Sequence, residues 1–368
     1  MTTSLIIVPS DASDDPDDIL FFILLAIRNP SPRRLLSRLI LAEKPGPLPL
    51  LGPLFSDIVT TMNILITGGS GFIGSHTTEL FVKDGHKVRV VDDFSSGARD
   101  NLSAVAGEIE LIDLDIRDYA ALEAACEGID TILHLAAIPS VEKSILEPLV
   151  THEVNATGSL NIIAAARRRD VRRVILASSA AIYGDYDELP KTENSPVQPI
   201  SPYAWHKLTG EFYGKSYGEL YGIEFLALRY FNVYGTRQDP KSPYSGVLSI
   251  FIERSLKGEP LTIHGDGGQT RDFIHVSDVA KANQLAAEAE WPLPQIMNVA
   301  TGNETKIIDA AGIIQQAASN QAGIVYDGPR TGDIRRSFAS CDLLEESLGY
   351  RPLINIEHGL TDLVAHSG

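Results

Sequence analysis

The stretch SPYAWHK, residues 201–207, places a phenol and an amine four residues apart. On a helix, Tyr203 and Lys207 would lie one turn apart and point the same way. Ser201 can cap such a helix, and Pro202 suits its first turn. A phenol loses its proton at about pH 10, and a fixed ammonium group nearby lowers that pKa. The pair can therefore act as a base near neutral pH, although a surface tyrosine above a solvated lysine has the same spacing.

A glycine-rich motif, TGGSGFIGSH, follows the apolar run NILIT at 63–67. Gly68, Gly71 and Gly74 lack side chains where a tight turn, a bound pyrophosphate and a helix packed on a sheet need space. The amides and the dipole of the following helix would favour phosphate groups. The motif therefore predicts a dinucleotide-binding turn between a first strand and a first helix.

Carboxylates end the next two apolar runs. Asp92 ends KVRVVD (87–92), at the spacing of about 20 residues typical of dinucleotide-binding turns. A carboxylate there binds ribose hydroxyls and repels a 2'-phosphate, which favours NAD over NADP; the alternative is that Asp92 only starts a turn. Asp115 ends IELIDLD (109–115) and either reaches the adenine amino group or caps a helix.

Strand and helix patterns alternate from Met62 onwards, with a clear helix over 150–169. Strands are predicted at 63–67, 87–92, 109–115, 131–136, 172–178 and 223–229. This alternation predicts an α/β fold with a Rossmann-type, doubly wound parallel sheet. After about Phe231 the pattern loosens into helices near 245–257, 276–289 and 305–318 and short strands at 261–265 and 296–300. We expect a smaller α/β substrate domain there, over the carboxyl edge of the sheet.

The first 61 residues differ from the rest, with 8 of the 21 prolines but only two of the 30 glycines. Their apolar run at 19–27 is too short to span a bilayer, and acidic residues precede it where a secretory signal carries positive charge. We expect 1–61 to be an extension outside the fold, 62–235 the NAD-binding domain and 236–368 mainly the substrate domain. The alternative for the extension is a short interfacial anchor.

The composition narrows the class of partner. The chain has 368 residues, 44% of them hydrophobic, which suffices for two domains, and its net charge is -17. Such an acidic surface repels phosphate backbones, so we expect no nucleic-acid partner. The two cysteines form neither a disulfide framework nor a metal site. We expect a cytoplasmic protein with no metal and no stable membrane insertion.

The motifs together resemble the extended short-chain dehydrogenase/reductase superfamily. The glycine turn, HLAA (134–137), SSAAIYG (178–184) and the Tyr–Lys pair carry this resemblance, which runs from Met62 nearly to the end. It implies that Tyr203 is the base and that Lys207 lowers its pKa and holds the nicotinamide ribose. It implies Ser179, with Ser178 as the weaker candidate, as the hydroxyl on the reacting substrate oxygen. The implied NAD site also includes Phe72, Ile73, Ile116, Ala136, Asn155 and Phe231.

The two residues after Ser179 narrow the reaction. In the superfamily, sugar-nucleotide 4,6-dehydratases carry an acid pair here, and related decarboxylases carry a glutamate at the second position. This chain has Ala180 and Ala181, neither of which can move a proton. Reversible oxidation remains, either as epimerisation or as plain dehydrogenation.

The substrate residues are also implied by the resemblance. They are Asn232, Arg271, Arg330 and Asp333, and two arginines suit a diphosphate. The match narrows to the NAD-dependent nucleotide-sugar epimerases, most like UDP-glucose and UDP-N-acetylglucosamine 4-epimerases. Ser337 stands where the family borders the C2 substituent of the sugar, and its small side chain leaves room for an N-acetyl group.

These observations lead us to expect an NAD-dependent 4-epimerase of a UDP-sugar, which accepts N-acetylated sugars either alone or alongside UDP-glucose and UDP-galactose. We expect a homodimer, as is usual for the family. The alternatives are a nucleotide-sugar dehydrogenase or reductase, a non-enzymatic NAD sensor, and an epimerase of another UDP-sugar such as a uronic acid.

Overall fold

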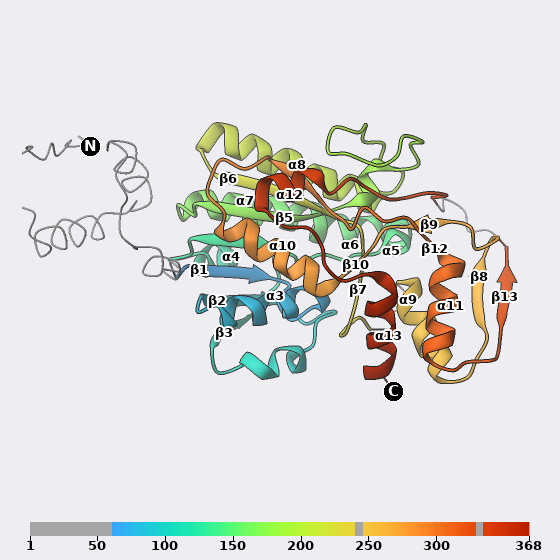
Figure 1. The fold of residues 1–368 in the computed structure, drawn as a ribbon. Coiled ribbons are helices and arrows are strands. Elements are labelled where there is room, and N and C mark those ends of the chain that lie inside the picture. Colours follow the sequence, from blue (N-terminus) through green and yellow to red (C-terminus); the bar gives the residue numbers. More distant parts are fainter. Residues whose placement is uncertain (1–60, 240–245, 329–333, 368) are drawn as a thin grey trace, which may run out of the picture. The chain divides into compact units, whose positions relative to one another are not determined.

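The structure is a computed structural model, which describes residues 61–239, 246–328 and 334–367 (Figure 1). The chain divides into two units, Met1–Val59 and Thr60–Gly368, and the first lies outside the described residues. Within the described ranges, no helix is both long and apolar enough to cross a membrane.

A parallel sheet forms the centre of the second unit, with the strand order β11-β6-β5-β4-β1-β2-β3. Its strands are β1 (Asn63–Thr67), β2 (Lys87–Asp92), β3 (Ile109–Asp113), β4 (Thr131–His134), β5 (Arg173–Ser179), β6 (Glu224–Tyr230) and β11 (Ile296–Val299). Most are continuous apolar runs, as strands covered on both faces require. The strand order reverses between β1 and β4, which is where such sheets bind ligands. The predicted Rossmann-type sheet is confirmed.

Helices cover both faces of this sheet. α3 (Phe72–Lys83), α10 (Val276–Glu288) and α12 (Asp342–Leu348) share one apolar core with it. On the other face, α4 (Tyr119–Ala125) and α7 (Gly158–Arg168) pack against the second core, beside α8 (Pro202–Tyr221). Gly214 lets α8 approach β6 closely, since a Cβ atom there would lie 1.9 Å from the Phe225 ring.

The predicted helix around the Tyr–Lys pair is α8. The Ser201 side chain accepts a hydrogen bond from the Ala204 amide at its start, and Pro202 is its first residue. Gly222 ends the helix in a left-handed conformation, with φ of 75°.

The predicted helix over 150–169 is interrupted. α5 (Val141–Leu146) and α6 (Pro148–His152) precede a π-helical turn at Glu153–Thr157, and α7 follows it. One extra residue per turn is a feature that often occurs at functional sites.

The remaining elements build the smaller part of the unit around a third core. α9 (Val247–Leu256), α11 (Ile307–Ala317) and α13 (Ile356–His366) pack there with the pair β8 (Leu261–His264) and β13 (Ile324–Asp327), seen side by side in Figure 1. Two further pairs are β7 (Asn232–Tyr234) with β10 (Phe273–His275), and β9 (Thr270–Arg271) with β12 (Thr305–Lys306). The strand expected at 296–300 is β11, which joins the central sheet through β6 and not the smaller part. Residues after 236 therefore contribute to both parts.

Candidate active site

The predicted reactive residues meet at the carboxyl end of β5. Ser179 is the last residue of that strand, and α8 carries Tyr203 and Lys207 beside it. The Nζ atom of Lys207 donates a hydrogen bond to the Ala177 carbonyl, 2.8 Å away, and lies 5.9 Å from the centre of the Tyr203 ring. The Tyr203 amide donates to the hydroxyl of Ser144 on α5 at 3.0 Å. Both ends of the Tyr–Lys pair are therefore fixed by neighbouring elements.

Burial controls the pKa values of this pair. It raises the pKa of Tyr203, and the neighbouring Ser179 side chain acts in the opposite direction. Burial also lowers the pKa of Lys207 to about 8, so the amine is still charged at neutral pH. The expectation that Lys207 brings the pKa of Tyr203 below its usual value is therefore not met by these side chains alone, because desolvation of the phenol has the larger effect.

The structure distinguishes the two serines of SSAAIYG. The Ser178 hydroxyl is buried and donates to Oε1 of Glu211 at 2.5 Å. The Ser179 hydroxyl is partly exposed and accepts from the Ala181 amide at 3.2 Å, where it caps the short 3-10 helix η3 (Ala180–Tyr183). Ser179 is thus the serine whose hydroxyl adjoins Tyr203.

The glycine turn lies between β1 and α3 as predicted. Gly68 has a φ of 69°, and a Cβ atom on Gly74 would lie 2.0 Å from the Gly68 carbonyl, so both positions require glycine. No side chain caps the first turn of α3, which begins with Phe72 and Ile73 after Gly71. Its amides are therefore suited to an anionic ligand.

Asp92 links the glycine turn to the end of β2. Its side chain is buried, with one oxygen accepting from the Ser70 amide and the other from the Phe94 amide, both at 2.9 Å. Each carboxylate oxygen can accept a second hydrogen bond, as ribose hydroxyls would supply. The hydroxyl of Ser70 is buried and has no partner among the described residues. The turn thus combines uncapped amides, an acidic acceptor and an unused hydroxyl, which fits a dinucleotide.

Asp115 lies two residues beyond β3 and is held by Arg117. The Arg117 side chain donates to both Asp115 oxygens and its amide donates to Oδ1 at 2.8 Å. These hydrogen bonds lower the pKa of the carboxyl group. The neighbouring Ile116 is buried in the second core, against Gly158.

The other predicted cofactor residues lie near the switch point of the sheet or just beyond β6. Asn155, in the π-helical turn, accepts from the Ile138 amide at 2.7 Å and donates to its carbonyl at 3.0 Å. Ala136 lies against the glycine turn, since a Cβ atom on Gly68 would be 2.7 Å from its amide nitrogen. Phe231 is buried beside Tyr183, with the ring centres 6.3 Å apart.

The predicted substrate residues are only partly described. Asn232 is exposed at the start of β7, and Arg271 donates to the Ile334 carbonyl at 2.7 Å. Ser337 is half-buried in a segment that is neither helix nor strand. Arg330 and Asp333 lie outside the described residues, so the expected convergence of two arginines stays a prediction.

The sequence analysis did not single out His134, although it lies within the HLAA motif. His134 is buried between the hydroxyls of Thr67 and Ser159, at 2.7 and 3.0 Å. Burial, and to a lesser extent the Lys207 charge, lowers its pKa to about 3. His134 is therefore a neutral link between β1, β4 and α7.

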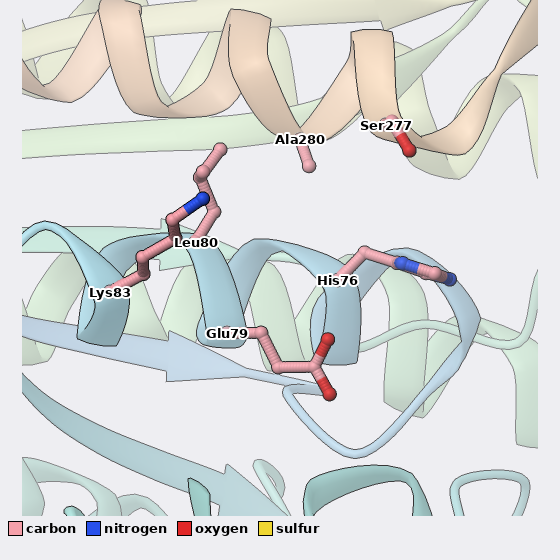
Figure 2. Close-up of a pocket in the computed structure, with 6 residues that line it drawn as sticks. All are labelled: His76, Glu79, Leu80, Lys83, Ser277 and Ala280. Atoms are coloured by element: carbon pink, nitrogen blue, oxygen red, sulfur yellow. The ribbon is translucent and has the colours of Figure 1, made fainter. Parts of the chain in front are cut away.

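A cavity of about 210 Å³ lies apart from these residues, between α3 and α10. Its lining consists of His76, Glu79, Leu80, Lys83, Ser277 and Ala280 (Figure 2). None of the predicted site residues lines it. In the described ranges, no group of three His, Cys, Asp or Glu side chains could hold a metal ion.

Comparison with known proteins agrees with this geometry. The model of the NAD dependent epimerase/dehydratase family matches residues 64–300. The UDP-glucose 4-epimerase of Mycolicibacterium smegmatis is 37% identical over 308 residues, covering 82% of this chain and 97% of the relative.

Two solved structures are also similar. One is a UDP-N-acetylglucosamine 4-epimerase from Methanobrevibacter ruminantium in complex with UDP-N-acetylmuramic acid (38% identity, TM-score 0.79, 83% of this chain and 97% of the other). The other is the UDP-glucose 4-epimerase of Thermotoga maritima with UDP-glucose (36% identity, TM-score 0.80, 83% and 98%). The matched motifs, the sheet order and these likenesses show that the chain belongs to the NAD-dependent epimerase/dehydratase family, whose cofactor is NAD.

Proposed function

We propose that this enzyme interconverts the C4 epimers of a UDP-sugar. The observation that carries the proposal is the arrangement at the end of β5. Ser179, Tyr203 and Lys207 lie together there, and the next two residues are alanines and not acids. The serine, tyrosine and lysine suit the oxidation and reduction of an alcohol. The two alanines offer no acid or base for eliminating water. Two of the similar solved structures are themselves 4-epimerases of UDP-sugars.

The chain's own residues would hold NAD at the carboxyl edge of the sheet. The first turn of α3 would bind the pyrophosphate, Asp92 the adenosine ribose and Lys207 the nicotinamide ribose, with Asp115 at the adenine. When bound, NAD supplies the acceptor and the donor of the hydride.

Proton transfer falls to Tyr203. Its phenolate oxygen would take the proton of the C4 hydroxyl and return it after the sugar has turned over. The Ser179 hydroxyl would donate a hydrogen bond to the same substrate oxygen. Lys207 would stabilise the phenolate, because its amine stays charged below about pH 8. The positive charge of the oxidised nicotinamide ring would act in the same direction.

The sugar must present both faces while the nucleotide stays bound. Arg271 and Arg330 would hold the diphosphate, with Asn232 and Asp333 beside it. Ser337 would leave space for an N-acetyl group at C2, so we include N-acetylated UDP-sugars among the substrates.

Proton NMR of UDP-galactose and of UDP-N-acetylglucosamine, incubated with the full chain and no added NAD, tests the proposal. Epimerisation with retained cofactor predicts a new anomeric signal from the C4 epimer. A 4-keto product that forms only when NAD is supplied would instead favour a dehydrogenase. No change under either condition would contradict the proposed substrates.

We further propose a homodimer formed through α5, α6 and α8. These adjacent helices expose large apolar side chains, including Leu146, Leu149, Trp205 and Phe212. Leu149 is 78% exposed and Trp205 55%. Analytical ultracentrifugation should give a dimer for the wild type and a monomer for the double variant Leu149→Glu, Trp205→Glu.

The buried free thiols of Cys126 and Cys341 support the predicted cytoplasmic location.

A further inference from the structure

A buried ion pair lies directly behind the Tyr–Lys pair. Glu211 on α8 and Arg229 on β6 form two parallel hydrogen bonds, Nε to Oε1 at 2.9 Å and Nη2 to Oε2 at 2.7 Å. Their side chains are only 5% and 3% exposed. Burial alone would lower the pKa of Arg229, but its contacts with Glu211 and with the Tyr183 hydroxyl more than reverse this and raise it. Two-point contacts of this kind fix direction as well as distance.

The ion pair belongs to a row of polar groups across the sheet. Ser178 on β5, Arg229 on β6 and Asn298 on β11 are neighbours in the strand register. Ser178 donates to Glu211 at 2.5 Å. Arg229 donates to the Tyr183 hydroxyl at 2.9 Å, and Tyr183 donates to Asn298 at 2.7 Å. The row therefore connects three strands, η3 and α8 at the level of Ser179.

The spacing on α8 connects this row to the reactive residues. Tyr203, Lys207 and Glu211 follow one another at intervals of four residues, so they lie on one face of the helix. Lys207 bonds to the Ala177 carbonyl and Glu211 to the Ser178 hydroxyl, which are successive positions of β5. The next residue of that strand is Ser179, the neighbour of Tyr203.

We propose that Glu211 and Arg229 are positioning residues, which fix α8 along β5 and β6 so that the Tyr203 hydroxyl meets the Ser179 hydroxyl. The proposal rests on the proposed roles of Tyr203 and Ser179. Replacing a buried ion pair with apolar side chains is often neutral or stabilising, so stability alone is a weak reason for keeping this one. The directional contacts of Glu211 with Ser178 and Arg229 define one register of α8 against β5 and β6.

The chain offers a matched control pair. Arg173 and Glu224 are register partners at the amino ends of the same two strands, β5 and β6. They form a hydrogen bond of 2.8 Å, with Arg173 1% exposed and Glu224 19%. Glu211→Gln and Glu224→Gln thus each neutralise the partner of a buried arginine, one beside Ser179 and one at the opposite edge of the sheet. A cavity of about 130 Å³ beside Glu211 and Arg229 gives water access to the arginine in the first variant.

The test combines kinetics with a direct titration of Tyr203 in the NAD-bound enzyme. We expect Glu211→Gln to keep its NAD and lower kcat at least tenfold, with KM changed by less than about threefold. The absorbance titration of Tyr203, taken as the difference from the Tyr203→Phe version of each protein, should move upward by at least half a pH unit. Glu224→Gln should leave both readouts at wild-type values.

Wild-type kcat and an unmoved Tyr203 titration in folded Glu211→Gln would overturn the proposal, as would equal effects in the two variants. If Glu211→Gln does not fold, the same measurements are made on Ser178→Ala. This variant removes one contact of the row, the hydrogen bond from Ser178 to Glu211. An upward titration shift is expected there, and an unmoved one would overturn the proposal. Because the titration needs no sugar, a shift without turnover of any UDP-sugar would contradict the proposed function and support the positioning role.

Discussion

The ammonium group of Lys207 bonds to the backbone carbonyl of Ala177, 2.8 Å away, two residues before Ser179. The helix that carries the proposed base is thereby tied to the strand that carries the proposed hydroxyl. Lys207 is buried, and this burial lowers its pKa from 10.5 to about 8. A charge buried in an apolar setting destabilises the fold. We therefore expect Lys207 to lower the free energy of unfolding while it supports the reaction.

Lys207→Met is therefore expected to abolish epimerisation and to stabilise the protein at pH 7. A lysine pKa lowered by more than two units corresponds to about 3 kcal/mol, of which the unpaired Ala177 carbonyl would offset about 1. We expect a net gain of about 2 kcal/mol in the free energy of unfolding. Urea unfolding with tryptophan fluorescence measures it.

The pH dependence of the free energy of unfolding is the control for the Lys207→Met prediction. Between about pH 8 and pH 10.5 the unfolded wild type binds the lysine proton more strongly than the folded form, so wild-type stability rises with pH in this window. Below about pH 8 the difference between the two proteins should be constant, and it should shrink as the pH rises towards 10. A difference that is the same at pH 7 and at about pH 9.5 would contradict the assigned pKa shift.

Tyr203→Phe should lower the rate at least about a hundredfold, because the phenol oxygen is the only group removed. Retained NAD and an unchanged unfolding midpoint would show that the loss is chemical. Tyr213→Phe, on the exposed side of the same helix, is the matched control and should react like the wild type. Turnover of Tyr203→Phe close to the wild-type rate would remove Tyr203 from the mechanism.

Ser337→Tyr should discriminate between N-acetylated UDP-sugars and UDP-sugars without an N-acetyl group. A tyrosine at this half-buried position would fill the space proposed for the N-acetyl group, so turnover of UDP-N-acetylglucosamine should be lost and turnover of UDP-galactose kept. Ser337→Ala keeps a small side chain and should act on both. Equal turnover of both sugars by the tyrosine variant, measured by NMR, would show that this position does not set the size of the C2 substituent.

His134→Gln should weaken the acid sensitivity of the fold. The pKa of His134 is lowered from 6.5 to about 3, so between these values the unfolded chain binds the extra proton and wild-type stability falls as the pH falls. From about pH 6.5 to pH 5, the wild type should lose about 2 kcal/mol relative to the variant. His358→Gln, at an exposed position of α13, should follow the wild type. Parallel stability curves for His134→Gln and the wild type would contradict the burial of a neutral imidazole.

The fold could be predicted because its signals are local. Each of the strands β1 to β6 begins and ends within two residues of the predicted bounds. The reason is that the ends of an apolar run between two turns mark the ends of the strand. The π-helical turn was missed because a pattern of apolar spacing does not reveal one extra residue in a turn. The place of β11 beside β6 was missed because strand pairing over about 70 residues leaves no local trace.

Part of the candidate site could also be predicted from the sequence. The proximity of Tyr203 and Lys207 could be predicted from their spacing, because a helix places residues four apart on one face, whereas their roles came from the motifs that resemble the superfamily. The resemblance favours Ser179 over Ser178, and the structure agrees, since neighbouring residues of a strand face opposite ways and the Ser178 hydroxyl donates to Glu211. The direction of the Tyr203 pKa shift and the pairing of Glu211 with Arg229 needed the structure, because burial and contacts between distant segments are properties of the packed molecule.

The short helix η3 carries the two residues that the family resemblance connects with the type of reaction. Ala180 and Ala181 follow Ser179 directly, are only half-buried and are held by the backbone cap that Ser179 provides. Ala180 packs against the edge of a small apolar cluster that includes Ile182 and Tyr183, and Ala181 belongs to none of the apolar clusters. By the resemblance described above, the 4,6-dehydratases carry their acid pair at these two positions, so the residues that distinguish the two reactions lie outside the central sheet. A single family can thus include epimerases and dehydratases on the same sheet, with the difference between them in a short 3-10 turn.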